Sequence, residues 1–144
     1  MKPLHALTAG LAGAVALTVT HQLLHKIFSV APRMDLMGEE ALTKISTDAA
    51  KTTEPTLYNI TMAGDVGVNT LYYALAAIGD SSNAPARGAA LGLAAGIGGV
   101  YLPKYLGLTN SYSDRTFKTR LMTVGIYTLG GLVTGLVMSK LDNN

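Results

Sequence analysis

The 144-residue sequence contains no cysteine and no tryptophan, and only 14% of its residues are charged. The lack of cysteine excludes a disulfide scaffold, a cysteine-based zinc site and a thiol enzyme. The charged fraction is low, since an average soluble domain has roughly 25% charged residues. The formal net charge of +2 is too small to indicate a protein that binds nucleic acid.

Apolar residues make up 49% of the chain, which excludes a disordered protein, and the length is that of one domain. A helix needs about 20 predominantly apolar residues to span a bilayer. Four stretches meet this requirement, at about 4–28, 58–79, 85–106 and 119–141. The sequence therefore predicts an all-α membrane protein in which residues 1–144 form a single bundle of four transmembrane helices.

Two of these stretches have alternative interpretations. The first, near the N-terminus, is similar to a signal peptide, but its apolar run is longer than the ~7–15 residues of a signal sequence. The second contains Asp65. It is therefore also compatible with a buried or re-entrant helix.

Residues 34–52 are predicted to form an amphipathic helix and not a span. Pro32 separates this segment from the first span. Its apolar residues recur at helical spacing on one face: Met34, Met37, Ala41, Ile45 and Ala49. We expect this helix to lie at the membrane interface or across the mouth of the bundle.

The distribution of lysine and arginine predicts the orientation, because cytoplasmic loops carry an excess of these residues. The loops after the first and third spans share one side and carry eight cations: Lys26, Arg33, Lys44, Lys51, Lys104, Arg115, Lys118 and Arg120. The other side receives both termini and carries Lys2, Arg87 and Lys140. We therefore predict cytoplasmic loops and outside termini, in a bacterial-type inner membrane.

Glycines at four-residue spacing predict close packing of helices, since small residues let helix backbones approach one another in lipid. They are Gly88, Gly92 and Gly96 in the third stretch, Gly131 and Gly135 in the fourth, and Gly13 in the first. A phosphate-binding loop is disfavoured, because no Gly-Lys-Ser/Thr string follows any of them. These faces suit packing within the bundle, or between protomers of a homo-oligomer or larger membrane complex.

Asp65 is the most informative polar residue, because a carboxylate in a spanning helix usually faces the bundle interior or a wet cavity. It belongs to a polar stripe on one helix face, formed by Tyr58, Thr61, Asp65, Asn69 and Tyr72. The stripe is either a contact for an ion, proton or ligand, or a hydrogen-bond network that fixes the helix register.

His21 and His25 lie one helical turn apart in the first span. Two histidines at this spacing can bind one metal ion, but two ligands do not complete a site. We therefore predict no metal and no cofactor. The alternative is that His25 reaches the membrane interface while His21 hydrogen-bonds to another helix.

Depth along the spans predicts that these residues meet. At about 1.5 Å per residue, His21 and Asp65 both lie roughly 9–11 Å from the cytoplasmic ends of their helices. The predicted cytoplasm-facing pocket contains Asp65, His21, His25, Asn69, Tyr101, Thr123 and Tyr127. Its predicted rim of Arg33, Lys104, Arg115 and Arg120 suits an anionic group such as a lipid phosphate.

The sequence contains no Gly-x-Ser-x-Gly and no His-Glu-x-x-His string. Together with the small size, this favours a non-enzymatic helix bundle that acts as a scaffold, an accessory subunit or a lipid-binding protein, with membrane lipids as partners. One alternative is a small oligomeric channel or carrier with Asp65 in its path. Another is a membrane enzyme for a lipid-like substrate, with Asp65, His21 and Arg120 at the site.

Overall fold

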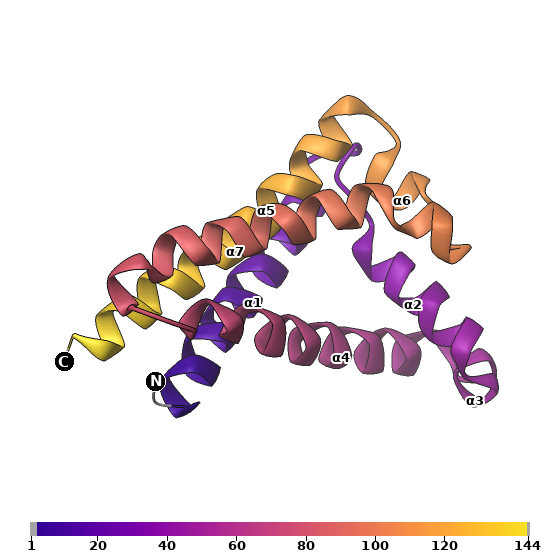
Figure 1. Cartoon of the computed structure of the whole chain (residues 1–144). Coiled ribbons are helices and arrows are strands. Elements are labelled where there is room, and N and C mark those ends of the chain that lie inside the picture. The colour runs from indigo at the N-terminus through magenta and orange to yellow at the C-terminus, as the bar shows by residue number, and fades with distance from the viewer. Residues whose placement is uncertain (1–2, 144) are drawn as a thin grey trace.

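The computed structural model describes residues 3–143, and this part of the chain contains helices and their connections but no strand (Figure 1). The four long helices are α1 (Pro3–Ile27), α4 (Glu54–Ala74), α5 (Ala84–Tyr101) and α7 (Phe117–Asp142). α2 (Met34–Ile45) and α3 (Thr47–Ala50) connect α1 to α4, and α6 (Ser111–Asp114) precedes α7. Three short 3-10 turns complete the chain: η1 (Leu75–Ala77), η2 (Ser81–Asn83) and η3 (Pro103–Leu106). Lys2, one of the cations from which the orientation is predicted, lies outside the described residues.

The all-helical class is confirmed, and two helices of the described chain, α1 and α7, are long and apolar enough to cross a membrane. The sequence predicted four. α4 carries Asn59, Asp65 and Asn69, whose polar side chains lower its hydropathy. α5 has only 18 residues, which include Arg87 and five glycines. By length and composition, the structure therefore supports two candidate spans, which is weaker support for a membrane location than four would be.

Helix boundaries differ from the predicted ones at two places. α5 ends at Tyr101, before the end of the third predicted stretch, because Pro103 lacks the backbone N–H that would continue the helix. The predicted amphipathic helix is divided at Ser46, whose backbone is extended. Its hydroxyl accepts a hydrogen bond from the amide of Ala49 and so caps α3.

α5 and α7 touch through their backbones at glycines. A Cβ atom on Gly131 would lie 2.0 Å from the carbonyl oxygen of Gly88, and one on Gly88 would lie 2.1 Å from that of Gly131. A real Cβ essentially never approaches so closely, so only glycine permits this separation. The same holds at Gly92, Gly96 and Gly135.

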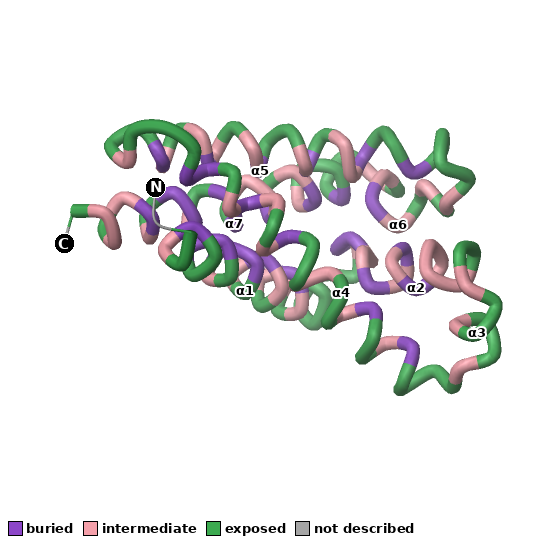
Figure 2. Tube along the Cα trace, turned by 60° about the horizontal axis from the view of Figure 1, so that its bottom comes forward, coloured by how far each residue is buried: buried purple, intermediate pink, exposed green. Residues whose placement is uncertain are grey.

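α1 packs on the other side of α7 and also contacts α4. A Cβ atom on Gly13 would lie 1.8 Å from Oγ1 of Thr134 in α7, and one on Gly10 would lie 2.3 Å from the carbonyl oxygen of Thr70 in α4. In space, therefore, α5 packs on α7, α7 packs on α1, and α1 packs on α4. In both views the N-terminal half of α4 leans away from the α5–α7 pair, and α2 lies against it (Figures 1 and 2).

The bundle exposes many large apolar residues and buries several polar ones. The outer face of α1 is a continuous apolar stripe of Leu4, Leu7, Leu11, Val15, Val19, Leu23 and Ile27. Buried polar residues of the long helices include His21, Asn69, Thr123 and Thr134. An exposed apolar surface of this extent is typical of contact with a membrane or with another protein.

We expect Gly131→Ala to destabilise the bundle, because its new Cβ would clash with a backbone oxygen of α5. Overpacking of this kind costs about 1–3 kcal/mol. Gly125→Ala is the matched control, since Gly125 is in the same helix with nothing within 4 Å of its Cβ position. Alanine stabilises a helix interior by up to about 1 kcal/mol over glycine.

Circular dichroism of the protein in detergent during heating measures this difference. The Tm of Gly131→Ala should fall, and that of Gly125→Ala should stay unchanged or rise. Equal Tm values for the two variants would contradict the backbone contact.

Candidate functional site

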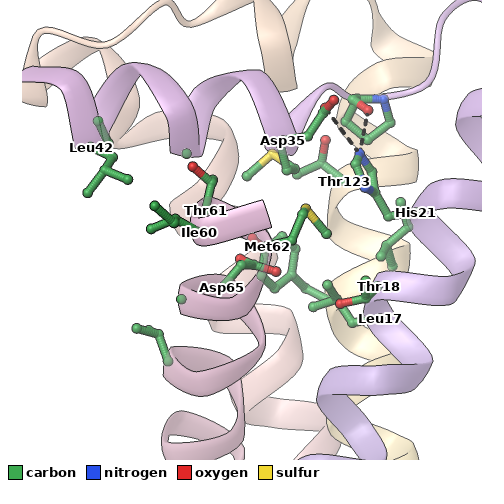
Figure 3. Close-up of a pocket in the computed structure, with 18 of the residues that line it drawn as sticks. Leu17, Thr18, His21, Asp35, Leu42, Ile60, Thr61, Met62, Asp65 and Thr123 are labelled. Atoms are coloured by element: carbon green, nitrogen blue, oxygen red, sulfur yellow. Dashed lines mark hydrogen bonds and ion pairs between the residues drawn. The ribbon is translucent and has the colours of Figure 1, made fainter. Parts of the chain in front are cut away.

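A cavity of about 480 Å³ lies between α1, α2, α4 and α7, where α4 leans away from the bundle (Figure 3). Its walls are mainly apolar, with Leu17, Leu42, Ile60, Val68 and Ile126 among the lining residues. A small set of polar side chains also lines it: Thr18, His21, Asp35, Thr61, Asp65, Thr123 and Tyr127. Apolar walls with a few polar groups are typical of a site for a small organic molecule.

His21 is a buried polar group of the cavity wall, and it is only 4% exposed. Its Nε2 lies 2.9 Å from the carbonyl oxygen of Pro32. Because a carbonyl only accepts, Nε2 carries the proton and donates it to this bond. The other ring nitrogen, Nδ1, makes no hydrogen bond with the described residues.

Pro32 belongs to the α1–α2 connection, and side chains hold this connection at three successive points. The carbonyl of Ser29 accepts a hydrogen bond from Arg115, and that of Val30 accepts one of 2.8 Å from Oγ1 of Thr119. His21 holds the third carbonyl, that of Pro32. These bonds fix where α2 begins and therefore place it over the cavity.

Asp65 projects from α4 toward α1, from which Thr18 and His21 extend into the same space (Figure 3). The Nδ2 of Asn69 donates to Oδ1 of Asp65 over 3.0 Å and to its carbonyl oxygen over 2.9 Å. The other carboxylate oxygen, Oδ2, receives no hydrogen bond from the described residues. Asn69 thus orients the carboxylate and leaves one oxygen to face the cavity.

Two hydroxyl groups in the cavity wall lack partners. Oγ1 of Thr18 and Oγ1 of Thr61 are buried, and neither makes a hydrogen bond within residues 3–143. Buried polar atoms are nearly always hydrogen-bonded, so these two hydroxyls, on residues that line one cavity, are available to a polar group that binds beside them. Helical spacing in the sequence places Thr61 in the polar stripe of α4, but it identifies neither threonine as a site residue.

The structure brings together His21, Asp65, Thr123 and Tyr127 from the predicted pocket, with Asn69 behind Asp65. The hydroxyl of Thr123 donates to the carbonyl oxygen of Thr119 within α7, over 2.8 Å. His25 and Tyr101 are exposed and do not line the cavity.

None of the four cations predicted for the rim lines the cavity. Arg33 forms an ion pair with Asp35 over 2.7 Å, and Arg120 forms one with Asp114. Arg115 is bound to the α1–α2 connection, and Lys104 lies 4.8 Å from the centre of the Tyr105 ring. Arg33 is held by Asp35, which itself lines the cavity, and the other three cations are held by partners outside it, so the four do not form a rim.

The polar face of α2 is not simply solvated, since Asp35 and Glu39 are each only 8% exposed. Burial raises the pKa of Asp35, but the hydrogen bond and charge of Arg33 outweigh it and hold that pKa below its usual value. Burial raises the pKa of Glu39, and the nearby charges of Glu54 and Asp35 raise it further. The two carboxyls therefore have opposite effects on folding at neutral pH.

Comparison with known proteins gives no match to a family model, to a curated protein or to a solved structure.

We expect Asp35→Asn and Glu39→Gln to change stability in opposite directions. The folded-state pKa of Asp35 is depressed, so its stabilising effect is present above its unfolded pKa and is lost as pH falls through the folded value. Asp35→Asn should therefore cost about 2 kcal/mol at neutral pH. The folded-state pKa of Glu39 is raised, so its ionised form opposes folding, and Glu39→Gln should raise the Tm at neutral pH.

Thermal unfolding of both variants at about pH 7 and about pH 3 tests this, because carboxyls are mostly protonated at the lower value. Both differences from the unsubstituted chain should shrink in acid. A lower Tm for Glu39→Gln at neutral pH would contradict the assignment.

Proposed function

We propose that this chain is a non-enzymatic membrane protein that binds one lipid-like molecule in the cavity between α1, α2, α4 and α7. The observation that carries the proposal is a mainly apolar cavity that contains buried hydroxyls without partners. Three of its apolar residues are also exposed at the surface: Ile45 at 83%, Ile60 at 51% and Val68 at 68%. The cavity therefore opens beside these residues, and its opening is apolar.

The distribution of polarity supports a membrane location. α1 and α7 are apolar over a length that can cross a bilayer, and the outer faces of the bundle expose leucine, isoleucine and valine. We propose that α4 and α5 also cross the membrane, with both termini outside and α2 and α3 at the cytoplasmic side of a bacterial-type inner membrane. In this arrangement a lipid-like molecule enters the cavity sideways, between α2 and α4.

Two bonds in the cavity orient side chains that line it. His21 is held by the carbonyl oxygen of Pro32, and Asp65 is held by Asn69. Acid–base catalysis needs side chains placed to pass a proton to a substrate. The two oriented groups suit recognition of a bound molecule, and the proposal of a non-enzymatic role rests on the sequence, which has no Gly-x-Ser-x-Gly and no His-Glu-x-x-His string.

Gly64→Leu should weaken binding, because Gly64 lines the cavity and a larger side chain there would occupy it. Gly67→Leu is the matched control. Both glycines lie in α4 with nothing within 4 Å of their Cβ positions, but Gly67 is not a lining residue. Native mass spectrometry of the protein in detergent, titrated with a medium-chain monoacylglycerol, should show about tenfold weaker binding for Gly64→Leu. Failure of the unsubstituted chain to bind any amphiphile, or equal losses in both variants, would overturn the proposal.

The four-span topology can be tested with single cysteines, since the sequence has no native thiol. Ser82, Asp48 and Thr109 are exposed positions in three different connections. In intact cells, a membrane-impermeant maleimide should label Ser82→Cys, and it should label Asp48→Cys and Thr109→Cys only after permeabilisation. Labelling of all three from the same side would rule out this topology.

A further inference from the structure

We propose that the polar end of the bound molecule is a protonated amine, which makes the cavity a site for a lipophilic amine. This inference rests on the proposed function and identifies the chemical class of the ligand. It differs from the anionic group that the sequence suggested.

Several polar atoms of the cavity wall can accept a hydrogen bond. Oδ2 of Asp65 is a carboxylate oxygen without a hydrogen bond from the described residues. The hydroxyl oxygens of Thr18 and Thr61 are buried without partners and can also accept. An ammonium group offers three donors and no acceptor, so it matches this set.

The charges of the cavity favour a cationic head. Its acidic lining residues are Asp35 and Asp65, and no lysine or arginine lines it. Its basic lining residue is His21, whose Nε2 lies 3.9 Å from Oδ1 of Asp35. Arg33 already pairs with Asp35, whereas no cation of the described chain forms an ion pair with Asp65. A buried charge is costly unless it is paired, so a ligand cation would compensate Asp65 and a ligand anion would add to the cost.

The arrangement of these groups suits one small head. Thr61 and Asp65 lie one turn apart on α4, and Thr18 and His21 lie nearly one turn apart on α1. Asp65 of α4 lies across the cavity from Thr18 of α1, and His21 of α1 is directed toward Pro32 and Asp35 (Figure 3). Within residues 3–143 no group of three or more ligating side chains is placed to hold a metal ion, which favours an organic cation.

The rest of the cavity suits an apolar body. Leu42 and Ile60 line the space between the polar groups of α4 and the surface, and Ile45 and Val68 lie at the opening. A molecule with its amine near Asp65 would therefore extend its apolar part toward the surface between α2 and α4. A hydrophilic amine would leave these walls in contact with water.

The experiment is a binding comparison of four probes that share one alkyl chain: a primary amine, an alcohol, a carboxylic acid and a phosphate monoester. Native mass spectrometry of the unsubstituted protein at about pH 7 measures each affinity, since the amine is then protonated and the acid ionised. The amine should bind at least about tenfold more tightly than the other three. This ranking does not depend on whether any variant folds.

Asp65→Asn should weaken amine binding by about tenfold and change alcohol binding by less than about twofold, because only the charge partner is lost. Thr18→Val should weaken amine binding to a smaller extent. Thr128→Val is its control, because the hydroxyl of Thr128 already donates to the carbonyl of Val124 and does not line the cavity.

The outcomes separate the two proposals. If none of the four probes binds, the proposed function fails. If they bind with equal affinity, if the acid or phosphate binds best, or if Asp65→Asn leaves amine binding unchanged, the cavity still binds lipid-like molecules but the assignment of an amine head is wrong.

Discussion

The backbone contact between α5 and α7 determines where the other helices can lie. The carbonyl oxygens of Gly88 and Gly131 lie 2.0 and 2.1 Å from the position that a Cβ would take on the opposite glycine. α7 is enclosed further by α1, which approaches it at Gly13. With both sides of α7 occupied, α4 packs mainly on α1. The N-terminal half of α4 therefore lies away from the α5–α7 pair, and the cavity forms in the space between them (Figures 1 and 3).

α2 closes part of this space, and its position depends on the connection that precedes it. The connection is exposed at Ser29 and buried at Pro32, and its buried backbone carbonyls need hydrogen-bond partners. The partners are His21 of α1, Thr119 of α7 and Arg115, which lies between α6 and α7. Gly38 then lets α2 approach α4, since a Cβ there would lie 2.6 Å from Cγ2 of Thr61. His21 thus serves both the fold and the cavity wall.

The net charge of the chain does not describe the charge of its cavity. The formal net charge is +2, yet the charged residues that line the cavity are carboxylates. Arg33 and Arg120 are held by Asp35 and Asp114. Pairing neutralises these cations locally, and the electrostatic character of the cavity is then set by Asp65, whose carboxylate is bonded only to the neutral amide of Asn69.

The polar stripe on α4 shows what sequence periodicity predicts and what it does not. Helical spacing places Tyr58, Thr61, Asp65, Asn69 and Tyr72 on one face, and the structure uses this face in three different ways. Thr61 and Asp65 line the cavity. The hydroxyl of Tyr58 accepts a hydrogen bond from Gln22 of α1, and that of Tyr72 donates to the carbonyl of Leu91 in α5. A single face contacts several neighbours because α4 diverges from the bundle along its length.

The sequence by itself determined the all-helical class, the approximate extent of the four long helices and the glycines that let them pack, because these depend on local composition and periodicity. It also indicated that His21 and Asp65 lie at similar depth. Only the tertiary structure decided which side chains meet. Arg33 forms an ion pair with Asp35, and Arg115 donates a hydrogen bond to the carbonyl oxygen of Ser29. Thr18 and Thr61 line the cavity. Those outcomes depend on the rotation and tilt of each helix against its neighbours, and spacing along one helix carries no information about either.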